Sequence, residues 1–360
     1  MKVLFVVVMV SVLLMGCKPS SSENETIDLS RVPEIQLVLA TTIHESDSVL
    51  FQRISEIVSD SSGNIILADQ MSNKIYQFNA DGTFLNTIGR EGEGPGEFRS
   101  ILYLFMDSRN RLFVGDISLD RTSIFEKNES QWQFLQNYST GAERYSVIAA
   151  SPADDVVLRK SPFQTPTYGT YWYEHVLGHG NLQSDSINTE LVRFKERGQL
   201  VDRNGWMNGI PFGPETLVAT SMDGFVYLLW NEAFNLEIYD SQINPIDTIR
   251  LQLPRAEVTD EELNQFSERM SEQFQNLLMQ HAPTTKPVAR KLEIDPLNRI
   301  WVQMYTNPEY LVINHEGNLL GVFNLSDSEV LMHVDKNRIY TTSTDTENGI
   351  VVSVYDYTLE

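Results

Sequence analysis

The sequence contains little cysteine and little positive charge. Cys17 is the only cysteine among 360 residues, so an intrachain disulfide cannot form and packing must hold the fold together. Lysine and arginine number 27 against 49 aspartates and glutamates, which gives a net charge of −22. A nucleic-acid partner is not expected, because neutralising phosphates requires clustered basic side chains. With 41% hydrophobic and 21% charged residues, the composition is that of a globular chain and excludes disorder and collagen-like structure.

The N-terminal apolar run is too short to cross a bilayer. It extends from Val3 to Met15, whereas a spanning helix needs about 20 residues, and this pattern is typical of a signal peptide. The sequence Leu14-Met15-Gly16-Cys17 resembles the lipobox of bacterial lipoproteins. The resemblance implies removal of residues 1–16 and acylation of Cys17, palmitate included. It also implies membrane anchoring in the cell envelope, at the outer membrane and either periplasmic or surface-exposed. An incidental or buried thiol is the alternative.

Residues 17–34 and residues 35–360 differ in their hydrophobic patterning. The first segment predicts a flexible lipidated tether, since it begins with a serine-rich, acidic stretch that has no hydrophobic periodicity. In the second, short apolar strands alternate with tight polar turns in a unit that recurs along the chain. Each unit has a second strand that opens with Gly, Asn or Asp, which tolerate the backbone of a tight turn. These segments are Gly63–Asp69, Asn110–Asp116, Asp154–Lys160, Gly224–Trp230, Asn298–Met304 and Asn337–Ser343.

Four antiparallel strands per unit, repeated radially, predict an all-β fold, a six-bladed β-propeller. The third strands are expected to end at Phe78, Phe125, Val176, Tyr239, Ile313 and Tyr355. The sixth unit has no room for a fourth strand before Glu360. We therefore expect Ile35–Thr42 to join blade six and close the ring, which removes an exposed sheet edge. An open sandwich and two smaller β-domains are the alternatives.

The segment Gly63–Phe98 resembles an NHL repeat, and more closely the six-bladed propeller lipoproteins of the Bacteroidetes type. The similarity is clear in the first two units and fades to the level of a pattern in the other four. Asp69 and Asp116, which end the second strands of those first two units, are not repeated in the others. The resemblance implies a fold and an envelope location, and it implies no reaction.

The strand order places nearly all long loops on one side of the disc, here called the long-loop face. The opposite side, the short-turn face, carries the tight turns. The long segments are 90–97, 161–169, 195–215 and an insertion over 255–288. The insertion predicts a helix, with Thr259 and Glu262 in a capping box. Its apolar side either packs on the propeller as a lid or brace, or binds a partner.

Long loops on a rigid scaffold are where binding sites usually lie. We therefore predict a binding or scaffolding module with a protein or carbohydrate ligand, and we expect no cofactor and no metal. The candidate ligand contacts are Arg90, Glu93, Asp69, Asp116, Arg121, Trp206 and Trp230. Trp206 is the sharpest candidate, because an exposed aromatic between glycines can anchor a ligand; burial under its own loop is the alternative. Arg90 and Arg121 suit a carboxylate or sulfate, unless they pair with Glu91 or Asp120.

A hydrolase or lyase with an active site on the propeller axis is the competing hypothesis. By their distance from the first turn of each blade, Glu293 and His333 share one register on adjacent innermost strands, where the other blades have Val58, Phe105, Ala149 and Ala219. The pair could act as acid and base, as in the lactonases and streptogramin lyase that this fold resembles, or could satisfy each other. A deep axial pocket containing both favours the enzyme, whereas a broad aromatic face favours the binding module.

Two further histidines are excluded as a metal site. His175 and His179 are predicted at the end of a strand and in the following turn. At about 3.3 Å per residue they would stand too far apart to share a zinc ion. We expect both to be surface histidines.

Overall fold

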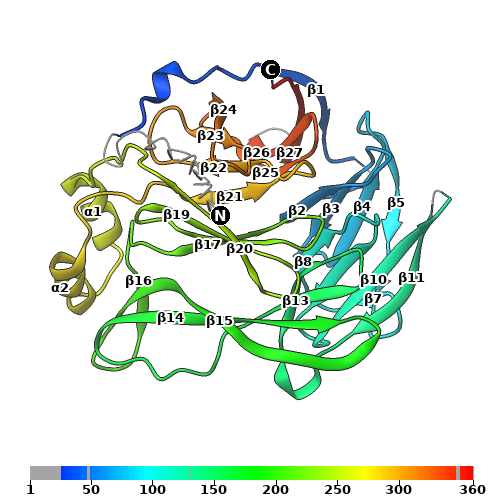
Figure 1. The fold of residues 1–360 in the computed structure, drawn as a ribbon, viewed down its shortest axis with the longest axis horizontal. Coiled ribbons are helices and arrows are strands. Elements are labelled where there is room, and N and C mark those ends of the chain that lie inside the picture. The colour runs from blue at the N-terminus through cyan, green and yellow to red at the C-terminus, as the bar shows by residue number, and fades with distance from the viewer. Residues whose placement is uncertain (1–25, 47–48, 130, 346–348, 360) are drawn as a thin grey trace, which may run out of the picture.

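A computed structural model describes residues 26–46, 49–129, 131–345 and 349–359. Its sheets are arranged radially around a central axis, as the ribbon shows (Figure 1). Six of these sheets are blades, so the predicted six-bladed propeller is confirmed. Among the described residues, no helix has the length and apolar character that a membrane crossing requires.

The first three blades follow the chain from residue 54 to residue 209. Blade one contains β2 (Ile54–Ser59), β3 (Ile65–Asp69), β4 (Lys74–Phe78) and β5 (Phe84–Ile88). Blade two contains β8 (Ile101–Met106), β9 (Leu112–Asp116), β10 (Arg121–Asn128) and β11 (Gln131–Tyr138). Blade three contains β12 (Ser146–Ala150), β13 (Asp155–Lys160), β14 (Gly169–Asn181), β15 (Ser184–Val201) and β16 (Met207–Gly209). Between blades one and two, β6 (Arg90–Glu91) and β7 (Glu97–Phe98) form a small parallel pair.

The other three blades complete the ring. Blade four contains β17 (Thr216–Thr220), β18 (Val226–Trp230), β19 (Phe234–Tyr239) and β20 (Pro245–Leu251). Blade five contains β21 (Lys291–Ile294), β22 (Ile300–Gln303), β23 (Tyr310–Ile313) and β24 (Leu319–Phe323). Blade six contains β25 (Val330–Val334), β26 (Arg338–Asp345), β27 (Gly349–Tyr357) and, on its outer edge, β1 (Leu37–Ile43).

The pairing of β1 with β27 confirms the predicted ring closure. The two strands run antiparallel, with Leu37 opposite Tyr357 and Thr42 opposite Ser353. In Figure 1 the blue N-terminal strand lies beside the red C-terminal strand in one sheet. The ends of the chain therefore share a blade, and the outer edge of β27 is covered.

Blade three departs from the predicted four-stranded pattern. The segment 195–215 was expected as a long loop, but residues up to Val201 extend β15 and Met207–Gly209 adds a fifth strand. The third strand, β14, also continues five residues beyond the predicted end at Val176. β14 and β15 form a long hairpin, because they pair with each other over most of their length. Gly169 lies opposite Val201 at one end, and Asn181 lies opposite Ser184 at the other.

The insertion between blades four and five forms two helices, not the single helix predicted. They are α1 (Asp260–Ser267) and α2 (Glu272–His281). The predicted capping box is confirmed: Glu262 N donates to Thr259 Oγ1 at 3.2 Å, and Thr259 N donates to Glu262 Oε2 at 3.1 Å. The buried residues Phe274, Leu277 and Leu278 of α2 pack with Leu200 of β15. The insertion therefore braces the edge of blade three, where Figure 1 shows it.

The first turns of blades one to five each combine an acceptor side chain with a residue of left-handed backbone, whereas the first turn of blade six, which the structure describes throughout, has no positive-φ residue. In blade one, Asn64 N donates to Asp60 Oδ1 at 3.0 Å, while Gly63 has a φ of 78°. In blade two the residue at the left-handed position is Asn110, with a φ of 61°. Glycine and asparagine open the second strands in the sequence because they accept this backbone at low cost.

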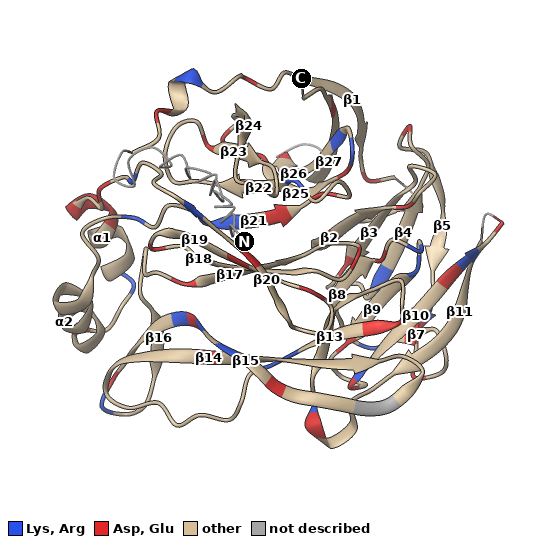
Figure 2. Cartoon of the chain, viewed as in Figure 1, with Lys and Arg blue, Asp and Glu red and all other residues tan. Residues whose placement is uncertain are grey.

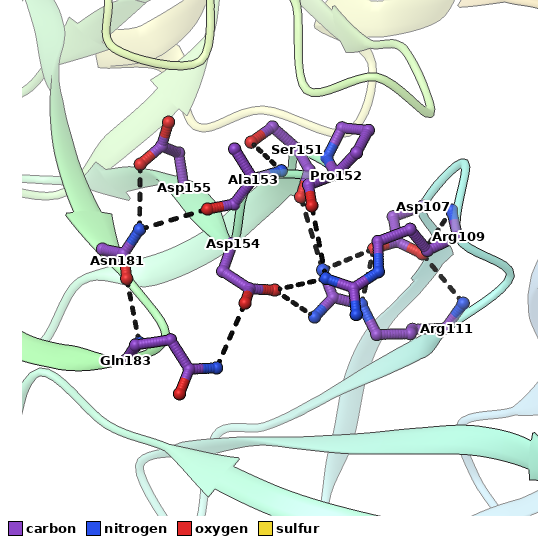
Figure 3. A network of polar contacts seen from close by, with 10 residues as sticks. All are labelled: Asp107, Arg109, Arg111, Ser151, Pro152, Ala153, Asp154, Asp155, Asn181 and Gln183. Carbon is purple, nitrogen blue, oxygen red and sulfur yellow. Dashed lines mark hydrogen bonds and ion pairs between the residues drawn. The ribbon is translucent and has the colours of Figure 1, made fainter.

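A polar network joins the first turns of blades two and three (Figure 3). Arg111 is buried between two carboxylates, donating to Asp107 Oδ2 at 2.7 Å and to Asp154 Oδ1 at 2.5 Å. Arg109 adds a second hydrogen bond to Asp154 Oδ1 at 2.9 Å. Since a buried charge is tolerated only when it is paired, this network fixes the angle between neighbouring blades on the short-turn face.

The segment before β1 lies against the propeller. Ile27 N donates to the carbonyl oxygen of Gln252 at 2.8 Å, and Leu29, in the short 3-10 helix Leu29–Arg31, is buried in the core of blades four and five. The tether predicted over 17–34 therefore does not include these docked residues. The signal peptide 1–16 and Cys17 lie outside the described residues.

Candidate functional site

The propeller axis contains a cavity with a volume of about 630 Å³. Its walls come from the innermost strand of every blade: β2, β8, β12, β17, β21 and β25. On the short-turn face, Ser108 N donates to the carbonyl oxygen of Met222 at 2.8 Å, which joins the first turns of blades two and four beneath the cavity. At the opposite end the lining includes Arg144, Lys160 and Ser161, next to the long loops. The cavity is therefore approached from the long-loop face.

Five of the six axial positions taken from the sequence line this cavity: Val58, Phe105, Ala219, Glu293 and His333. Ala149 does not, and Ile148 takes its place. The register of β12 shifts between Val147 and Ala149, so one extra residue bulges there. A bulge reverses which side chain faces a given side of the sheet, and the sequence pattern did not reveal it.

His333 lines the cavity, is partly exposed to it, and has polar partners. Its Nε2 lies 3.2 Å from Ser59 Oγ, and Ser59 in turn donates to Asp335 Oδ2 at 2.9 Å. The ring also packs against Tyr340, with centroids 5.4 Å apart. Burial lowers the pKa of His333, although Asp335 and Glu293 oppose the shift. The imidazole is therefore neutral near pH 7 and held in one orientation.

Glu293 forms an ion pair within its own strand. Lys291 Nζ lies 3.0 Å from Glu293 Oε1 and also donates to the carbonyl oxygen of Leu331. Figure 2 shows basic and acidic residues together on β21. Glu293 and His333 thus both line the cavity, but they do not contact each other. Glu293 pairs with Lys291, and His333 contacts Ser59.

Glu56 is a cavity residue that the sequence analysis missed. It lines the cavity from β2 and forms no hydrogen bond or ion pair with any described residue. Burial, followed by the charge of Glu293, raises the pKa of Glu56 to about 7, while Lys291 acts in the opposite direction. The available signal was its position two residues before Val58, because alternate strand residues share a face.

The wall from blade three carries a second charged cluster. Arg159 Nε donates to His175 Nδ1 at 2.8 Å, and His175 Nε2 lies 2.8 Å from Glu196 Oε2. Since Nδ1 accepts a hydrogen bond, the ring proton is on Nε2 and is donated to Glu196. Arg159 completes the triangle with an ion pair of 2.7 Å to Glu196 Oε1. The positive charge of this wall is therefore neutralised.

The placement predicted for His175 and His179 is wrong. Both lie within β14, because that strand continues to Asn181. Neither is a surface histidine: His175 contacts Arg159 and Glu196, and His179 Nε2 lies 3.3 Å from Asp155 Oδ1. Different partners occupy the two rings, which therefore do not face one common point.

Asp69 and Asp116 are buried and serve the backbone. Asp69 accepts from the backbone N–H groups of Gln52 and Arg53, at 2.8 and 3.0 Å, and from two in its own turn. Asp116 accepts from Arg99 at 2.6 Å and from three other backbone N–H groups. Their assignment as ligand contacts is corrected, since both carboxylates are already saturated and hold the entry loop of their blade.

The loop 90–97 is held by ion pairs and carbonyl contacts. Arg90 pairs with Glu97 at 2.6 Å, not with Glu91, and its side chain remains 81% exposed. Arg99 pairs with Glu93 at 2.6 Å. Arg121 donates to the carbonyl oxygens of Glu93, Gly94 and Glu97, and not to Asp120. Arg121 is therefore a brace for the loop, whereas Arg90 remains accessible.

Trp206 is exposed and Trp230 is partly buried. Trp206, at 72% exposure, lies in the turn between β15 and β16, where Asp202 Oδ1 accepts from its backbone N–H at 2.8 Å. Burial under its own loop is excluded. Trp230 packs against Trp172, with centroids 5.6 Å apart, and donates to Glu232. Phe163, in the loop before β14, is 96% exposed, so the blade-three side of this face presents two free aromatic rings.

The predicted loop residues and the axial cavity are separate features. None of the seven candidates, from Asp69 to Trp230, lines the cavity. Both features that were to discriminate between the two hypotheses are present: an axial pocket with Glu293 and His333, and exposed aromatics on the long-loop face.

The radial sheets and the axial cavity define a six-bladed β-propeller. Residues 20–136 match the model of a family described as 6-bladed beta-propeller, DUF5128. The match spans less than half of the 360 residues. None of the curated proteins compared with the sequence is significantly similar to it.

Two solved structures from Bacteroides share the fold over nearly their whole length. One is a protein from Bacteroides fragilis proposed to be exported, with 12% identity, a TM-score of 0.52, and coverage of 93% of this chain and 98% of the other. The other is a DUF4221 family member from Bacteroides vulgatus, with 12% identity, a TM-score of 0.59, and coverage of 92% and 99%. At this identity the similarity shows the fold alone.

Proposed function

We propose that the protein is a lipid-anchored binding or scaffolding module of the cell envelope, with its ligand site on the long-loop face. The observation that carries the proposal is the axial cavity of about 630 Å³. On the short-turn face, the hydrogen bond between Ser108 and Met222 lies beneath this cavity. This volume lies within the usual range for ligand pockets, about 300–1,000 Å³. The cavity is the deepest part of the proposed site, and the exposed aromatics elsewhere on the long-loop face, Phe163 and Trp206, are suited to a protein or carbohydrate.

The location rests on the N-terminus and on one structural relative. The order of charged residue, apolar run, Gly16 and Cys17 supports export followed by lipidation of the cysteine. The protein from Bacteroides fragilis is proposed to be exported, which supports the same compartment here. Two or three acyl chains on Cys17 would provide stable anchoring where a single chain would not.

Capture from the native membrane tests the binding function. The acylated protein is cross-linked in its own membranes, and the captured partner is then measured against Trp206→Ala and Leu297→Ala variants. Leu297 is a matched control, because it is 54% exposed in the first turn of blade five, on the short-turn face. We expect Trp206→Ala to weaken capture and Leu297→Ala to preserve it. Equal loss in both, or in neither, contradicts a site on the long-loop face.

A hydrolase or lyase at the axis is the second candidate, favoured by the shared cavity of Glu293 and His333. The neutral imidazole of His333 could act as a base. Against this, His333 contacts Ser59 and Glu293 pairs with Lys291. Turnover of lactone or ester substrates that falls at least a hundredfold in Glu293→Gln, with unchanged thermal stability, would establish the enzyme.

A further inference from the structure

One carboxylate in the axial cavity has no partner. Glu56 lines the wall from blade one and forms no hydrogen bond or ion pair with the described residues, while its neighbour Glu293 is paired with Lys291 at 3.0 Å. Blades one and five, which stand on either side of blade six, therefore contribute two carboxylates, Glu56 and Glu293, and one ammonium group, that of Lys291. One negative charge among these groups is unmatched.

The cations elsewhere in the cavity do not compensate for Glu56. Arg159 is paired with Glu196 at 2.7 Å, and Lys160 with Glu143 at 3.3 Å. Arg144 is mostly exposed, with Asp120 at 3.8 Å. His333 and Asp335 are joined through Ser59. Each of these charged groups already has a partner of its own. None of them is therefore available to neutralise the carboxylate of Glu56.

Glu56 shares the cavity with several apolar side chains. They come from other blades and include Leu104, Phe105, Val218, Leu292 and Met332. Phe105 stacks on Phe113 with centroids 4.7 Å apart, which fixes the ring at the cavity wall. Apolar walls favour the apolar body of a ligand. An isolated carboxylate in such surroundings is costly unless it is protonated or joined by a positive charge.

We propose that the axial cavity binds an organic cation, an ammonium group on an apolar body, with Glu56 as the residue that receives the positive charge. This inference rests on the proposed function, which makes the cavity part of the ligand site. On binding, the carboxylic acid of Glu56 releases its proton to solvent, and the resulting carboxylate pairs with the ammonium group. The ligand therefore takes the place of a proton.

Proton release gives the inference a direct measurement. Because the pKa of Glu56 is about 7, the ionised fraction rises about tenfold between pH 6 and pH 8. Calorimetric titration of the full chain with 2-phenylethylammonium should show about tenfold tighter binding at pH 8. In two buffers of different ionisation enthalpy, about half a proton should be released per ligand at pH 7. Neither measurement requires a variant.

Matched probes and variants separate the possible causes. 2-Phenylethanol has the same apolar body without charge, and 3-phenylpropanoate carries the opposite charge. Glu56→Gln should weaken 2-phenylethylammonium binding at least tenfold at pH 8 and abolish its pH dependence, while Glu56→Asp should retain part of both. Glu91→Gln, the same change at an exposed residue of β6, should alter neither. A melting curve for each variant verifies that it is folded.

Three results would overturn the inference. They are equal binding of the alcohol or the carboxylate, binding of the amine without proton release, and no saturable binding of the amine. Any of these leaves the capture experiment with Trp206→Ala unaffected, so the binding function and the cation site can fail independently.

Discussion

The α-carbon of Gly115 faces the ring of Tyr103 so closely that a methyl group there would lie 2.1 Å from Cζ. The Tyr103 hydroxyl lies 2.7 Å from Thr122 Oγ1 and accepts from Val147 N at 3.1 Å. Tyr103 on β8 therefore crosses over β9 and reaches β12 of the next blade. Burial raises the pKa of its hydroxyl to about 12, so the group remains a neutral donor and acceptor.

Substitution at this contact should destabilise the junction of blades two and three. Gly115→Ala has no room for the new methyl group, and overpacking of this kind costs about 1–3 kcal/mol. Tyr103→Phe keeps the ring but leaves Val147 N–H without this acceptor, at a cost of about 1–3 kcal/mol. Denaturant unfolding measures both. Gly209→Ala, where φ is not positive and the added Cβ would come no closer than 3.8 Å to the side chain of Arg197, is a control for the loss of a glycine. A Gly115→Ala protein as stable as the parent would contradict the contact.

Removal of Ile35–Thr42 should open the ring. The deletion exposes the edge of β27, which β1 covers from Leu37 to Ile43, and removes the buried side chains of Ile35 and Ile43. We expect it to cost most of a total stability of about 5–15 kcal/mol and to promote association through the free edge. Calorimetry and size-exclusion chromatography measure the two effects. A truncated protein that melts like the parent and stays monomeric would show that closure lies elsewhere.

Cys17→Ser should release the protein from the membrane. If acyl chains on Cys17 provide the anchor, the serine variant has no thiol to modify and should appear in the detergent-free soluble fraction. Fractionation followed by mass spectrometry of the N-terminal peptide provides the measurement. Ser21→Ala, in the same stretch of sequence, should remain membrane-bound. Unchanged partitioning of Cys17→Ser would refute the lipoprotein assignment.

Glu56 should make stability fall as the pH rises toward neutrality. Its pKa increases from 4.5 in the unfolded chain to about 7 in the native protein. Between these values the native state holds a proton that the unfolded state has lost, so the free energy of unfolding decreases with rising pH. The contribution is on the order of 3 kcal/mol across that range. In Glu56→Gln this slope should be absent, and in Glu91→Gln it should remain. An identical pH profile for all three proteins would show that the carboxylate of Glu56 is solvated and that folding does not raise its pKa.

The fold could be predicted because most blades repeat a local rule. In five of the six blades a glycine, asparagine or aspartate at a left-handed turn position, such as Gly63, Asn110 or Asp154, precedes the apolar second strand. The interior of the site follows no such rule. The bulge before Ala149 and the five residues that β14 adds beyond Val176 depend on pairing partners, which the sequence of one strand does not contain.

The roles of polar residues were harder to predict for a related reason. Asp69 stands at the end of a strand in a loop-rich region, a position that fits either a ligand contact or a loop cap, and only the backbone N–H groups around it decide between them. Glu56 was overlooked because the comparison between blades used one layer of the axis, the layer of Val58, and Glu56 belongs to the next layer. Glu56 matters because its carboxylate has no hydrogen-bond or ion-pair partner among the described residues. The sequence alone does not show which side chains lie within reach of one another.

The shared sheet of β1 and β27 also constrains the order of folding. Leu37 and Tyr357, which lie opposite each other in that sheet, are 357 − 37 = 320 residues apart in sequence. Joining them closes the longest loop in the described chain, and loop-closure entropy makes such a contact late to form. Until it forms, blade six lacks its outer strand and the edge of β27 stays unpaired. We expect the propeller to acquire its stability in a single concluding step, and a chain interrupted before β27 to remain a substrate for chaperones and proteases rather than a smaller folded protein.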